Sequence, residues 1–356
     1  MSIIEKFINF ARKYINKIFT TMFGQHRIAV IGGGSWATAI ISLLTNNVKE
    51  GNKVNWYLRK KEHIDYAIKH GQNPKYLNSL ILDTDKIEFY NDLNDAIKKS
   101  DTLIFAVPSA FIESTMSQFD GTLENHVVVS AIKGMIPTKN TIMADYFHDT
   151  YNVDLEKNFC VLAGPCHAEE VALQRLSYLT IASKNLSTAE EIANCLECKY
   201  LKTSITDDIY GTEYAAVLKN VFAIAAGICS GLGYGDNFLA VLMSNAIREM
   251  KRFVDTVHPI TRDIKSSAYL GDLLVTAYSK FSRNRTLGVM LGQGYSLQSA
   301  LLEMKMVAEG FYGSKCIHQI NEKYNIELPI CNAVYNILHN GTPVGFEIKL
   351  LIDKIR

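Results

Sequence analysis

The sequence predicts an α/β fold, with a doubly wound parallel sheet in its first part and a mainly helical, all-α second domain. Two patterns support this prediction. Between residue 27 and about residue 205, short apolar runs typical of buried strands alternate with helical patterns, as in a sheet covered on both faces. From about Asp207 onward, helical patterns follow one another and strand signals are nearly absent.

The individual elements follow from these patterns. Strands are expected at residues 27–31, 53–57, 102–107, 127–131, 159–163 and 178–182. Helices in the same part are expected at residues 36–45, 62–70, 93–98, 141–147 and 189–195. The second domain is expected to hold helices at residues 213–227, 240–253, 271–278, 296–308, 313–321, 329–338 and 345–354. The boundary between the two parts is expected near residues 203–208.

Composition narrows the class of protein. The chain has 356 residues, enough for two domains, and 48% of them are hydrophobic. The 37 basic and 36 acidic residues balance, so we expect no nucleic-acid partner. Seven scattered cysteines favour the reducing cytoplasm. Cys195 and Cys198 form a CxxC pair without a second such pair, so we expect no metal site.

Residues 1–24 form an unusual extension before the first strand. Apolar residues recur there at helical spacing, with Lys6, Arg12, Lys13 and Lys17 between them. One interpretation is an amphipathic helix that makes weak contact with a membrane surface. The alternatives are a helix packed on the fold, or an upstream extension with Met22 as a second start. The segment lacks the continuous apolar stretch of a secretory signal.

A glycine-rich turn joins the first expected strand to the first expected helix. Gly32, Gly34 and Ala37 match the G-x-G-x-x-G/A pattern of a dinucleotide-binding turn. The two glycines permit a tight turn and a close approach to a pyrophosphate, and the helix N-terminus offers it unpaired N–H groups. We therefore expect a Rossmann-type dinucleotide-binding domain over residues 25–206 and a helical substrate domain over residues 207–356.

The end of the second expected strand bears on the choice of dinucleotide. NAD-binding domains usually carry a carboxylate there for the ribose 2′-hydroxyl. Arg59 and Lys60 stand near that position here, and arginine can bind a 2′-phosphate with two parallel hydrogen bonds. The sequence therefore favours NADP over NAD, with a solvated basic helix start as the alternative.

Two lysines are candidates for chemistry. Lys133 follows an expected strand at the ligand edge, where it can hold a phosphate or polarise a carbonyl, unless it is an ordinary surface lysine. Lys219 and Asn220 interrupt a strongly apolar helix. Burial would lower the pKa of Lys219 towards the range useful for acid–base work. The alternative is a lysine that extends from the core to solvent.

Polar residues at three further turns are candidates for substrate contacts. Cys166 and His167 follow an expected strand, and adjacent turn residues rarely face each other, so a substrate loop is favoured over a nucleophile–base pair. Asp272 begins an apolar helix, where capping that helix is the alternative. Arg283 and Asn284 offer donors suited to phosphate oxygens.

Taken together, these motifs resemble those of NAD(P)-dependent glycerol-3-phosphate dehydrogenases of the bacterial, cytosolic type. The matching stretches, in the family's order, are residues 32–39, 73–77, 106–109, 130–134, 164–171, 211–213, 218–220, 233–237, 270–273, 282–284 and 307–310. The resemblance implies reversible hydride transfer between NAD(P)H and C2 of dihydroxyacetone phosphate, giving sn-glycerol 3-phosphate for glycerophospholipid synthesis. We accordingly expect a cytoplasmic homodimer that acts on a small phosphorylated substrate.

The resemblance also implies roles for individual residues. Lys219 matches the catalytic lysine that exchanges a proton with the C2 oxygen. Lys133 would assist it electrostatically, and Asp272 would orient Lys219. The implied substrate contacts are Lys133, Gly164, Cys166, Lys219, Asp272, Ser282, Arg283 and Asn284. The implied cofactor contacts are Gly32, Gly34, Ser35, Trp36, Arg59, Lys60, Tyr76, Lys133, Ala168, Arg283, Val307 and Glu309.

The chain departs from the family's pattern in the substrate loop. The family usually reads Gly-Pro-Ser-Phe-Ala, whereas residues 164–168 read Gly-Pro-Cys-His-Ala. A thiol is a weaker hydrogen-bond partner than a hydroxyl, which leaves the side-chain role of Cys166 open. Two other functions also stay open: a related dehydrogenase acting on another small substrate, and a non-catalytic sensor that binds NADP(H).

Overall fold

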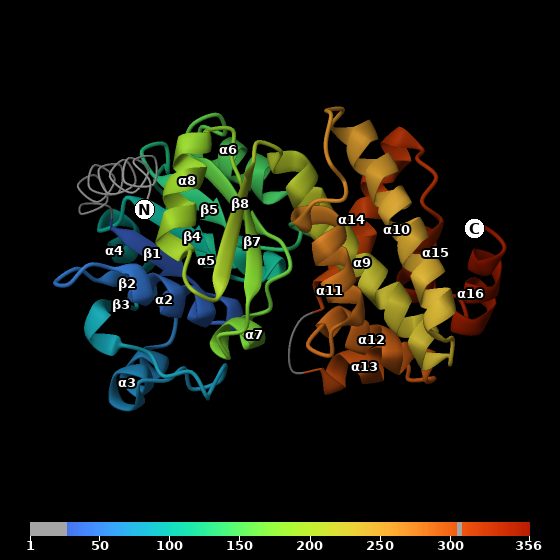
Figure 1. Ribbon diagram of the computed structural model, residues 1–356, viewed down its shortest axis with the longest axis horizontal. Helices are drawn as coiled ribbons and strands as arrows, with labels where there is room; N and C mark the ends of the chain where they lie inside the picture. Colours follow the sequence, from blue (N-terminus) through green and yellow to red (C-terminus); the bar gives the residue numbers. More distant parts are fainter. Residues whose placement is uncertain (1–26, 305–307) are drawn as a thin grey trace, which may run out of the picture.

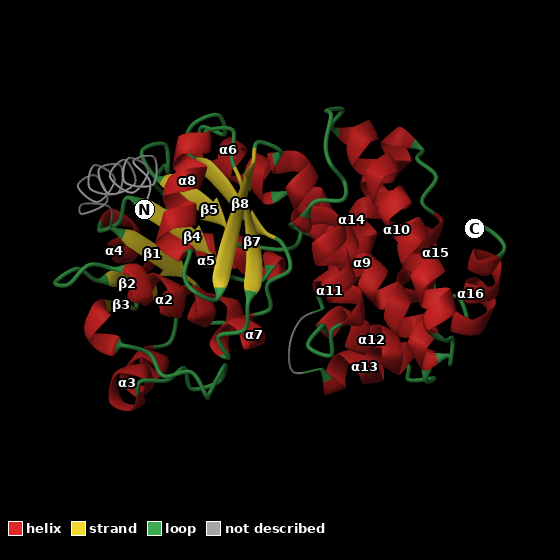
Figure 2. Cartoon of the chain, in the orientation of Figure 1, coloured by secondary structure: helices red, strands yellow, loops and turns green. Residues whose placement is uncertain are grey.

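The computed structural model describes residues 27–304 and 308–356. Figure 1 shows a sheet domain and a helical domain side by side, and Figure 2 shows that the strands are confined to the first. The predicted α/β fold followed by an all-α domain is therefore confirmed. The amphipathic segment over residues 1–24 lies outside the described residues.

The sheet has eight strands in the order β3-β2-β1-β4-β5-β6-β7-β8. Their bounds are β1 Ile28–Ile31, β2 Val54–Tyr57, β3 Ile87–Tyr90, β4 Thr102–Phe105, β5 Val127–Ser130, β6 Phe159–Ala163, β7 Ser177–Ala182 and β8 Leu201–Thr206. Neighbours from β3 to β6 pair in parallel. The carboxyl ends of β1, β2, β4 and β5 therefore lie along one edge.

The sequence predicted a parallel sheet, but one pair of neighbouring strands in the structure is antiparallel. β7 runs antiparallel to β6 and parallel to β8. A parallel crossover must carry the chain back over a strand length of roughly 17–20 Å. The helix between β6 and β7, α7 (Ala168–Ala172), has 5 residues. It covers only about 7 Å, so this connection lacks the long crossover helix usual between parallel strands, in keeping with the antiparallel pairing.

The two edge strands, β3 and β8, are not predicted by the sequence. Both have partly exposed side chains along their length. They therefore lack the continuous apolar run by which the buried parallel strands are found.

Helices cover both faces of the sheet. One face packs against α2 (Ser35–Asn47), α7 and α8 (Leu186–Leu196). The opposite face packs against α4 (Leu93–Lys98), α5 (Ile112–Met116) and α6 (Met143–Tyr151), and this core continues into the helical domain. A further helix, α3 (Lys61–His70), follows β2. Because one core spans sheet and helices, the two domains pack as one unit.

The helical domain is built around α9 (Ile209–Gly231), which is buried along nearly its whole length. The other helices are α10 Asp236–Val257, α11 Asp272–Tyr278, α12 Arg283–Gly292, α13 Leu297–Glu303, α14 Glu309–Tyr324, α15 Pro329–His339 and α16 Val344–Ile352. By length and composition α9 could cross a membrane, but 89% of its most apolar window is buried inside the domain. It is therefore a core helix.

Helices α9 and α12 cross with their backbones in contact. A Cβ on Gly227 would lie 2.1 Å from the Arg285 carbonyl oxygen, and one on Gly288 would lie 2.1 Å from that of Ile224. Only glycine fits at this crossing. The sequence does not predict α12, because Gly288 and Gly292 lower the helix propensity of its 10 residues.

Candidate active site

A cavity of about 920 Å³ lies between the two domains. Its walls come from the carboxyl ends of β1, β2, β4 and β5 and from helices α9, α11, α12 and α14. The expected site residues that line it are Gly32, Gly34, Ser35, Trp36, Arg59, Lys60, Tyr76, Lys133, Cys166, Ala168, Lys219, Asp272, Ser282, Arg283, Asn284 and Glu309. Gly164 lies beside it and contacts Lys133 and Asp272 through its backbone. Val307 lies outside the described residues.

The glycine turn forms the nucleotide end of the cavity. Gly32 has φ +135°, and a Cβ there would lie 2.5 Å from the Ala106 carbonyl oxygen, so this position requires glycine. Gly34 precedes α2, and a Cβ there would meet no described atom within 4 Å. The first turn of α2 has no side-chain cap among the described residues. Its N–H groups are thus available to an anion, which fits a dinucleotide pyrophosphate.

Two further features at this end fit a dinucleotide. The indole Nε1 of Trp36 is buried without a hydrogen-bond partner in the described part of the chain, and Trp36 lines the cavity. A buried donor of this kind normally has a partner. At the end of β2, Arg59 and Lys60 are exposed on the cavity wall, and Lys60 pairs with Glu62 at 3.0 Å. Lys75 also lines the cavity there, which makes this part of its wall basic.

The centre of the site is an ion-pair cluster. Lys219 Nζ lies 2.5 Å from Asp272 Oδ1, and the two side chains are only 4% and 2% exposed. Asp272 Oδ2 accepts a hydrogen bond from the Gly164 N–H at 3.1 Å and lies 3.7 Å from Lys133 Nζ. Lys133 Nζ also donates to the Gly164 carbonyl at 3.2 Å. One carboxylate thus holds both lysines beside the cavity.

This arrangement decides two alternatives left open by the sequence. Lys219 is buried and paired, so it does not extend to solvent. The cap of α11 is Gly271, without a side-chain cap hydrogen bond, and the Asp272 carboxylate faces the lysines instead. Asp272 therefore faces the two lysines beside the cavity and does not cap its helix.

Burial and charge set the protonation of the cluster. Burial lowers the pKa of Lys219 below its usual range, Asp272 opposes this shift, and Lys133 adds to it. Burial would raise the pKa of Asp272, but Lys133 and Lys219 outweigh it and hold that pKa below its ordinary value. Asp272 is therefore a carboxylate, and Lys219 is a lysine that releases its proton more readily than an exposed one.

A chain of amides joins the cluster to the neighbouring elements. Asn220 donates to the Lys133 carbonyl at 2.8 Å and accepts a hydrogen bond from Asn284 Nδ2 at 2.8 Å. Asn284 Oδ1 accepts from the Gly310 N–H at 2.9 Å. These bonds connect the segment after β5 with α9, α12 and α14. Asn284 lines the cavity, but its amide is already engaged on both sides.

The start of α12 presents Arg283 to the cavity. Ser282 caps this helix, because its hydroxyl accepts from the Arg285 N–H at 3.3 Å. The glycine crossing described above fixes the backbone of α12 against that of α9. A guanidinium at a helix N-terminus is suited to a phosphate group.

The loop that carries Cys166 and His167 does not form a nucleophile–base pair. Burial raises the pKa of the Cys166 thiol to about 12, so a reactive thiolate is not favoured. Burial lowers the pKa of His167 to about 4, with Lys133 adding to the shift, so its ring is neutral. His167 Nε2 is buried without a partner among the described residues. Cys166, His167 and Ala168 all line the cavity, as expected of a substrate loop.

Glu309 joins the two domains at the rim of the cavity. Its carboxylate accepts hydrogen bonds from the Ser109 N–H at 2.9 Å and from the Ser109 hydroxyl. Burial raises the pKa of Glu309, and the bonds to Ser109 oppose that shift. The sequence placed Glu309 among the cofactor contacts but gave no sign of this partner.

Several residues of the cavity wall are not among those that the sequence predicts. Those with polar side chains or rings include Tyr57, His63, Lys75, Thr276, Phe281 and Tyr312. Lys75 lies within the matching stretch at residues 73–77, and Thr276 lies one turn after Asp272 on α11. Those two could have been found from their neighbours, whereas nothing local marks the others.

The fold and the cavity are typical of a two-domain oxidoreductase. A dinucleotide-binding sheet domain faces a helical domain whose buried lysine–aspartate pair lines the cavity between them. Comparison with known families narrows this class. The model of the NAD-dependent glycerol-3-phosphate dehydrogenase N-terminus matches residues 27–189, and the model of the C-terminus matches residues 208–348. The chain belongs to the NAD-dependent glycerol-3-phosphate dehydrogenase family.

Individual relatives agree with this assignment. The chain is 33% identical to the NAD(P)+ glycerol-3-phosphate dehydrogenase of Staphylococcus carnosus, over 92% of this chain and 98% of that protein. It is also 33% identical to the Bacillus cereus protein of the same name, over 93% and 96%. The crystal structure of a Coxiella burnetii glycerol-3-phosphate dehydrogenase matches with a TM-score of 0.84 at 26% identity, over 92% and 99%.

Proposed function

We propose that this chain catalyses the reversible reduction of dihydroxyacetone phosphate to sn-glycerol 3-phosphate with NAD(P)H. The observation that carries the proposal is the buried Lys219–Asp272 pair, which faces a cavity whose other end is a dinucleotide-binding turn. The relatives named above supply the substrate. The product would serve glycerophospholipid synthesis.

Each residue of the proposed site has a separate role in the transfer of the hydride and the proton. The bound dinucleotide supplies a hydride to C2. Lys219 holds a proton at Nζ and passes it to the C2 oxygen, and its lowered pKa makes this transfer less costly. Asp272 orients the ammonium, and Lys133 keeps a positive charge near the oxygen while negative charge develops there. In the reverse direction, neutral Lys219 accepts the hydroxyl proton.

Arg283 is proposed to bind the substrate phosphate. It stands at the N-terminus of α12 on the cavity wall, where its guanidinium and the helix dipole both favour an anion. Holding the phosphate positions C2, so binding energy from a remote group assists the reaction. The other proposed substrate and cofactor contacts are the expected site residues that line the cavity, together with Gly164 and Val307.

Initial rates with the purified chain test this function. We expect reduced nicotinamide to be consumed on addition of dihydroxyacetone phosphate, and much more slowly with dihydroxyacetone, which lacks the phosphate. Faster turnover of a 2-oxo acid would indicate a related dehydrogenase instead. Cofactor binding without turnover of any substrate in the panel would indicate a sensor.

We further propose a preference for NADP over NAD. Arg59 stands on the cavity wall at the end of β2, the position from which a 2′-phosphate is recognised. Replacing Arg59 by Ala should raise KM for NADPH by about 10-fold, the scale of a lost charge-assisted hydrogen bond, and leave KM for NADH nearly unchanged. Equal changes for both cofactors would contradict the preference.

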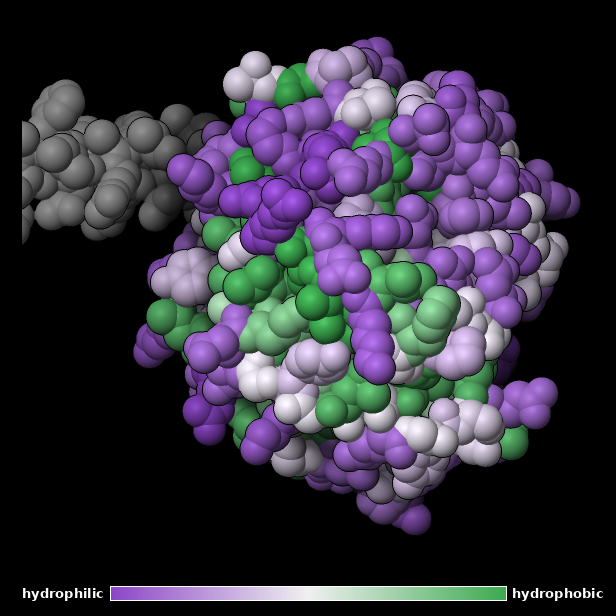
Figure 3. All heavy atoms as spheres, turned by 90° about the vertical axis from the view of Figure 1, so that its right-hand side faces the viewer, coloured by the Kyte–Doolittle hydropathy of each residue, from purple (hydrophilic) through white to green (hydrophobic). Residues whose placement is uncertain are grey.

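We propose that the chain forms a homodimer through the outer face of the helical domain. Figure 3 shows hydrophobic side chains gathered on the face at the far end from the sheet. The exposed apolar residues of α10 and α16 are Val241, Phe346 and Leu350. Pairing there would leave the cavity open. Light scattering should give a dimer, and Phe346→Glu should give a monomer; a monomeric wild type would contradict this.

The domain limits, location and N-terminal segment are also proposals. β8 ends at Thr206 and α9 begins at Ile209, which supports domains over residues 25–206 and 207–356. The seven cysteines are free, in keeping with the cytoplasm. Residues 1–24 precede the family match, and we propose that they make weak contact with a membrane surface. Partition of the full chain into anionic vesicles, compared with a chain that lacks residues 1–21, tests this contact.

A further inference from the structure

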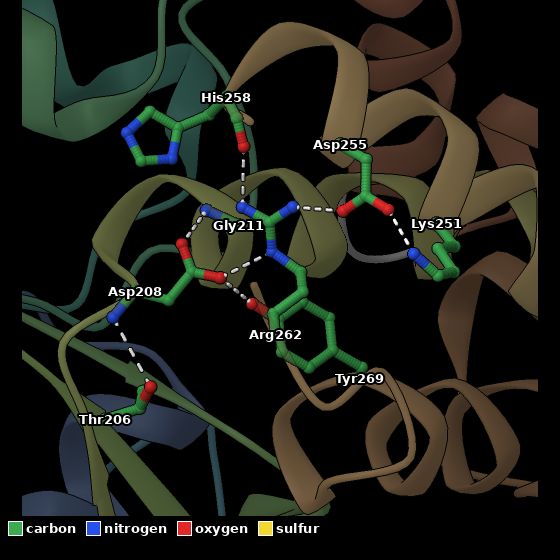
Figure 4. Close-up of polar contacts among 8 residues, drawn as sticks. All are labelled: Thr206, Asp208, Gly211, Lys251, Asp255, His258, Arg262 and Tyr269. Carbon is green, nitrogen blue, oxygen red and sulfur yellow. Dashed lines mark hydrogen bonds and ion pairs between the residues drawn. The ribbon is translucent and has the colours of Figure 1, made fainter. Parts of the chain in front are cut away.

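A buried polar network lies at the junction of the two domains. Figure 4 shows Asp208, Arg262 and Tyr269 meeting at the start of α9. The side chains of Arg262 and Asp208 are 2% and 4% exposed, and Tyr269 is buried as well. Within the described residues, none of the three lines the cavity. Contact with substrate therefore does not account for the network.

Asp208 is the centre of the network. Its carboxylate caps α9 by accepting a hydrogen bond from the Gly211 N–H at 2.9 Å. It also accepts from Arg262 Nε at 2.8 Å and from the Tyr269 hydroxyl. A Cβ on Gly211 would lie 2.3 Å from the carboxylate and 2.5 Å from the Tyr269 hydroxyl. The network therefore rests directly on the backbone of α9.

Arg262 extends the network to α10. Its Nη1 pairs with the Asp255 carboxylate near the end of that helix, and its Nη2 donates to the His258 carbonyl at 2.8 Å. Lys251 pairs with the other Asp255 oxygen at the exposed end. Asp208 and Arg262 are the buried partners of this network. Separating them would leave a buried charge uncompensated, so the pair resists movement of the segments that carry it.

The network holds the two segments that carry the catalytic pair. Lys219 follows Asp208 by eleven residues, about three turns, so both lie on the same side of α9. Tyr269 belongs to a π-helical turn, Ser267–Gly271, which leads directly into Asp272. Lysine side chains on a helix point back towards its N-terminus. Tyr269 thus fixes the start of α11 beside the part of α9 that Lys219 reaches.

We propose that Asp208, Arg262 and Tyr269 are positioning residues that hold Asp272 against Lys219. The proposal rests on the proposed function, because this contact matters for turnover only if Lys219 exchanges a proton with substrate. Loosening the network should let Asp272 move away from Lys219. The other groups that act on Lys219 are Lys133 after β5 and the Cys166–His167 loop after β6. None of these groups is negatively charged, so none of them could replace Asp272.

The pH dependence of turnover reports this contact. In the reduction direction Lys219 must be protonated, so the rate falls as pH rises through its pKa. Asp272 opposes the lowering of that pKa by burial, so its displacement should lower the pKa further. The descending limb of kcat should then move to lower pH by about one unit, since misplacing an opposite charge has effects on this scale.

Tyr269→Phe is the sharpest variant, because it removes one hydroxyl and leaves the Asp208–Arg262 pair in place. We expect kcat to fall roughly 10-fold or more, as for other small misplacements of catalytic groups, with KM for substrate nearly unchanged. The descending limb of the plot of kcat against pH should move to lower pH by about one unit. Arg262→Lys keeps the charge but loses the planar set of guanidinium donors. It should also lower kcat and move the descending limb to lower pH.

Lys251→Ala is the matched control, since it removes only the half-exposed end of the network. Lys251→Ala should leave kcat and the position of the descending limb of its pH profile at wild-type values. A Tyr269→Phe enzyme with wild-type kcat and limb would overturn the proposal, and so would a lower kcat with an unmoved limb, which marks a purely structural role. A wild type that does not reduce dihydroxyacetone phosphate would instead overturn the proposed function.

Discussion

Glu213 and Lys219 are both buried on α9, and the same loss of water affects them in opposite directions. Burial raises the pKa of Glu213 to about 8, whereas it lowers the pKa of Lys219. Glu213 accepts a hydrogen bond from the Ala144 N–H at 2.9 Å and so ties α9 to the first turns of α6. Glu213 does not line the cavity, so its ionisation concerns stability.

The raised pKa of Glu213 predicts a pH-dependent stability. Between the ordinary carboxyl pKa and about 8, the folded state keeps a proton that the unfolded state releases. The contribution of Glu213 to stability should therefore fall as pH rises through this window, by up to about 1.4 kcal/mol per pH unit. Glu213→Gln stays neutral and should show a shallower fall in the free energy of unfolding, measured by urea titration.

The exposed Glu190 provides the control for this measurement. Glu190→Gln should keep the wild-type slope. Identical slopes for the wild type and Glu213→Gln would show that Glu213 is already ionised in the folded protein. Burial also raises the pKa of Glu249, to about 7. Its contribution to the fall of the free energy of unfolding with pH should therefore remain in Glu213→Gln and in Glu190→Gln.

The residues of the site differ in how far the sequence alone could identify them. Lys219 is identifiable because a lysine–asparagine pair interrupts an apolar helix. Its partner Asp272 looks locally like a helix cap, so only the family resemblance pointed to it, and only the folding of α11 onto α9 brings the two together. His167 could be placed in a loop, but its unpartnered nitrogen depends on burial by distant segments.

At the scale of elements, the crossing of α9 and α12 determines the geometry of the site. The two helices meet through glycines, and each carries one of the residues proposed to contact substrate, Lys219 on α9 and Arg283 on α12. Close backbone contact leaves no side chain that can yield between them. Any added atom at the crossing must therefore move one helix.

Gly288→Ala tests this crossing. Its Cβ would lie 2.1 Å from the Ile224 carbonyl oxygen, so we expect a loss of about 1–3 kcal/mol in the free energy of unfolding and a rise in KM for substrate. Gly345→Ala on α16 is the matched control, because no described atom lies within 4 Å of a Cβ there. If both variants were equally stable, the crossing would not be close-packed in solution.

The elements also show where sequence patterns fail. The buried strands β1, β2, β4, β5 and β6 are predicted because their apolar runs reflect burial on both faces. The edge strands and α12 are missed for opposite reasons. In β8 most residues are polar and in β3 a glutamate interrupts the apolar run, whereas α12 carries glycines that a helix interior usually avoids.

At the scale of the whole molecule, the site exists only where two domains meet. Glu309 on α14 reaches Ser109 after β4 and closes the rim of the cavity. The shared core beneath the sheet and the Asp208 network hold the opposite side. The sequence predicts both domains and their order, but it says nothing of these contacts between them, because they join residues far apart in the chain.

Ser109→Ala tests the contact across the rim. It removes the hydroxyl donor and keeps the N–H, so Glu309 loses one of its two bonds to the sheet domain. We expect KM for NAD(P)H to rise by about 3- to 10-fold, the scale of one hydrogen bond, with kcat little changed. Ser117→Ala, at an exposed serine of the same segment, should behave as wild type. Unchanged cofactor KM in Ser109→Ala would rule out a role for this contact in cofactor binding.

The central claim is that Lys219 exchanges the proton with the C2 oxygen. Its most direct test is the single-turnover rate of dihydroxyacetone phosphate reduction by Lys219→Met, which fills the buried space without an ammonium, beside the exposed control Lys157→Met. We predict a loss of roughly 100-fold or more for Lys219→Met, as for a missing general acid, with cofactor binding retained and the control unchanged. A folded Lys219→Met enzyme that turns over at near wild-type rate would contradict the account.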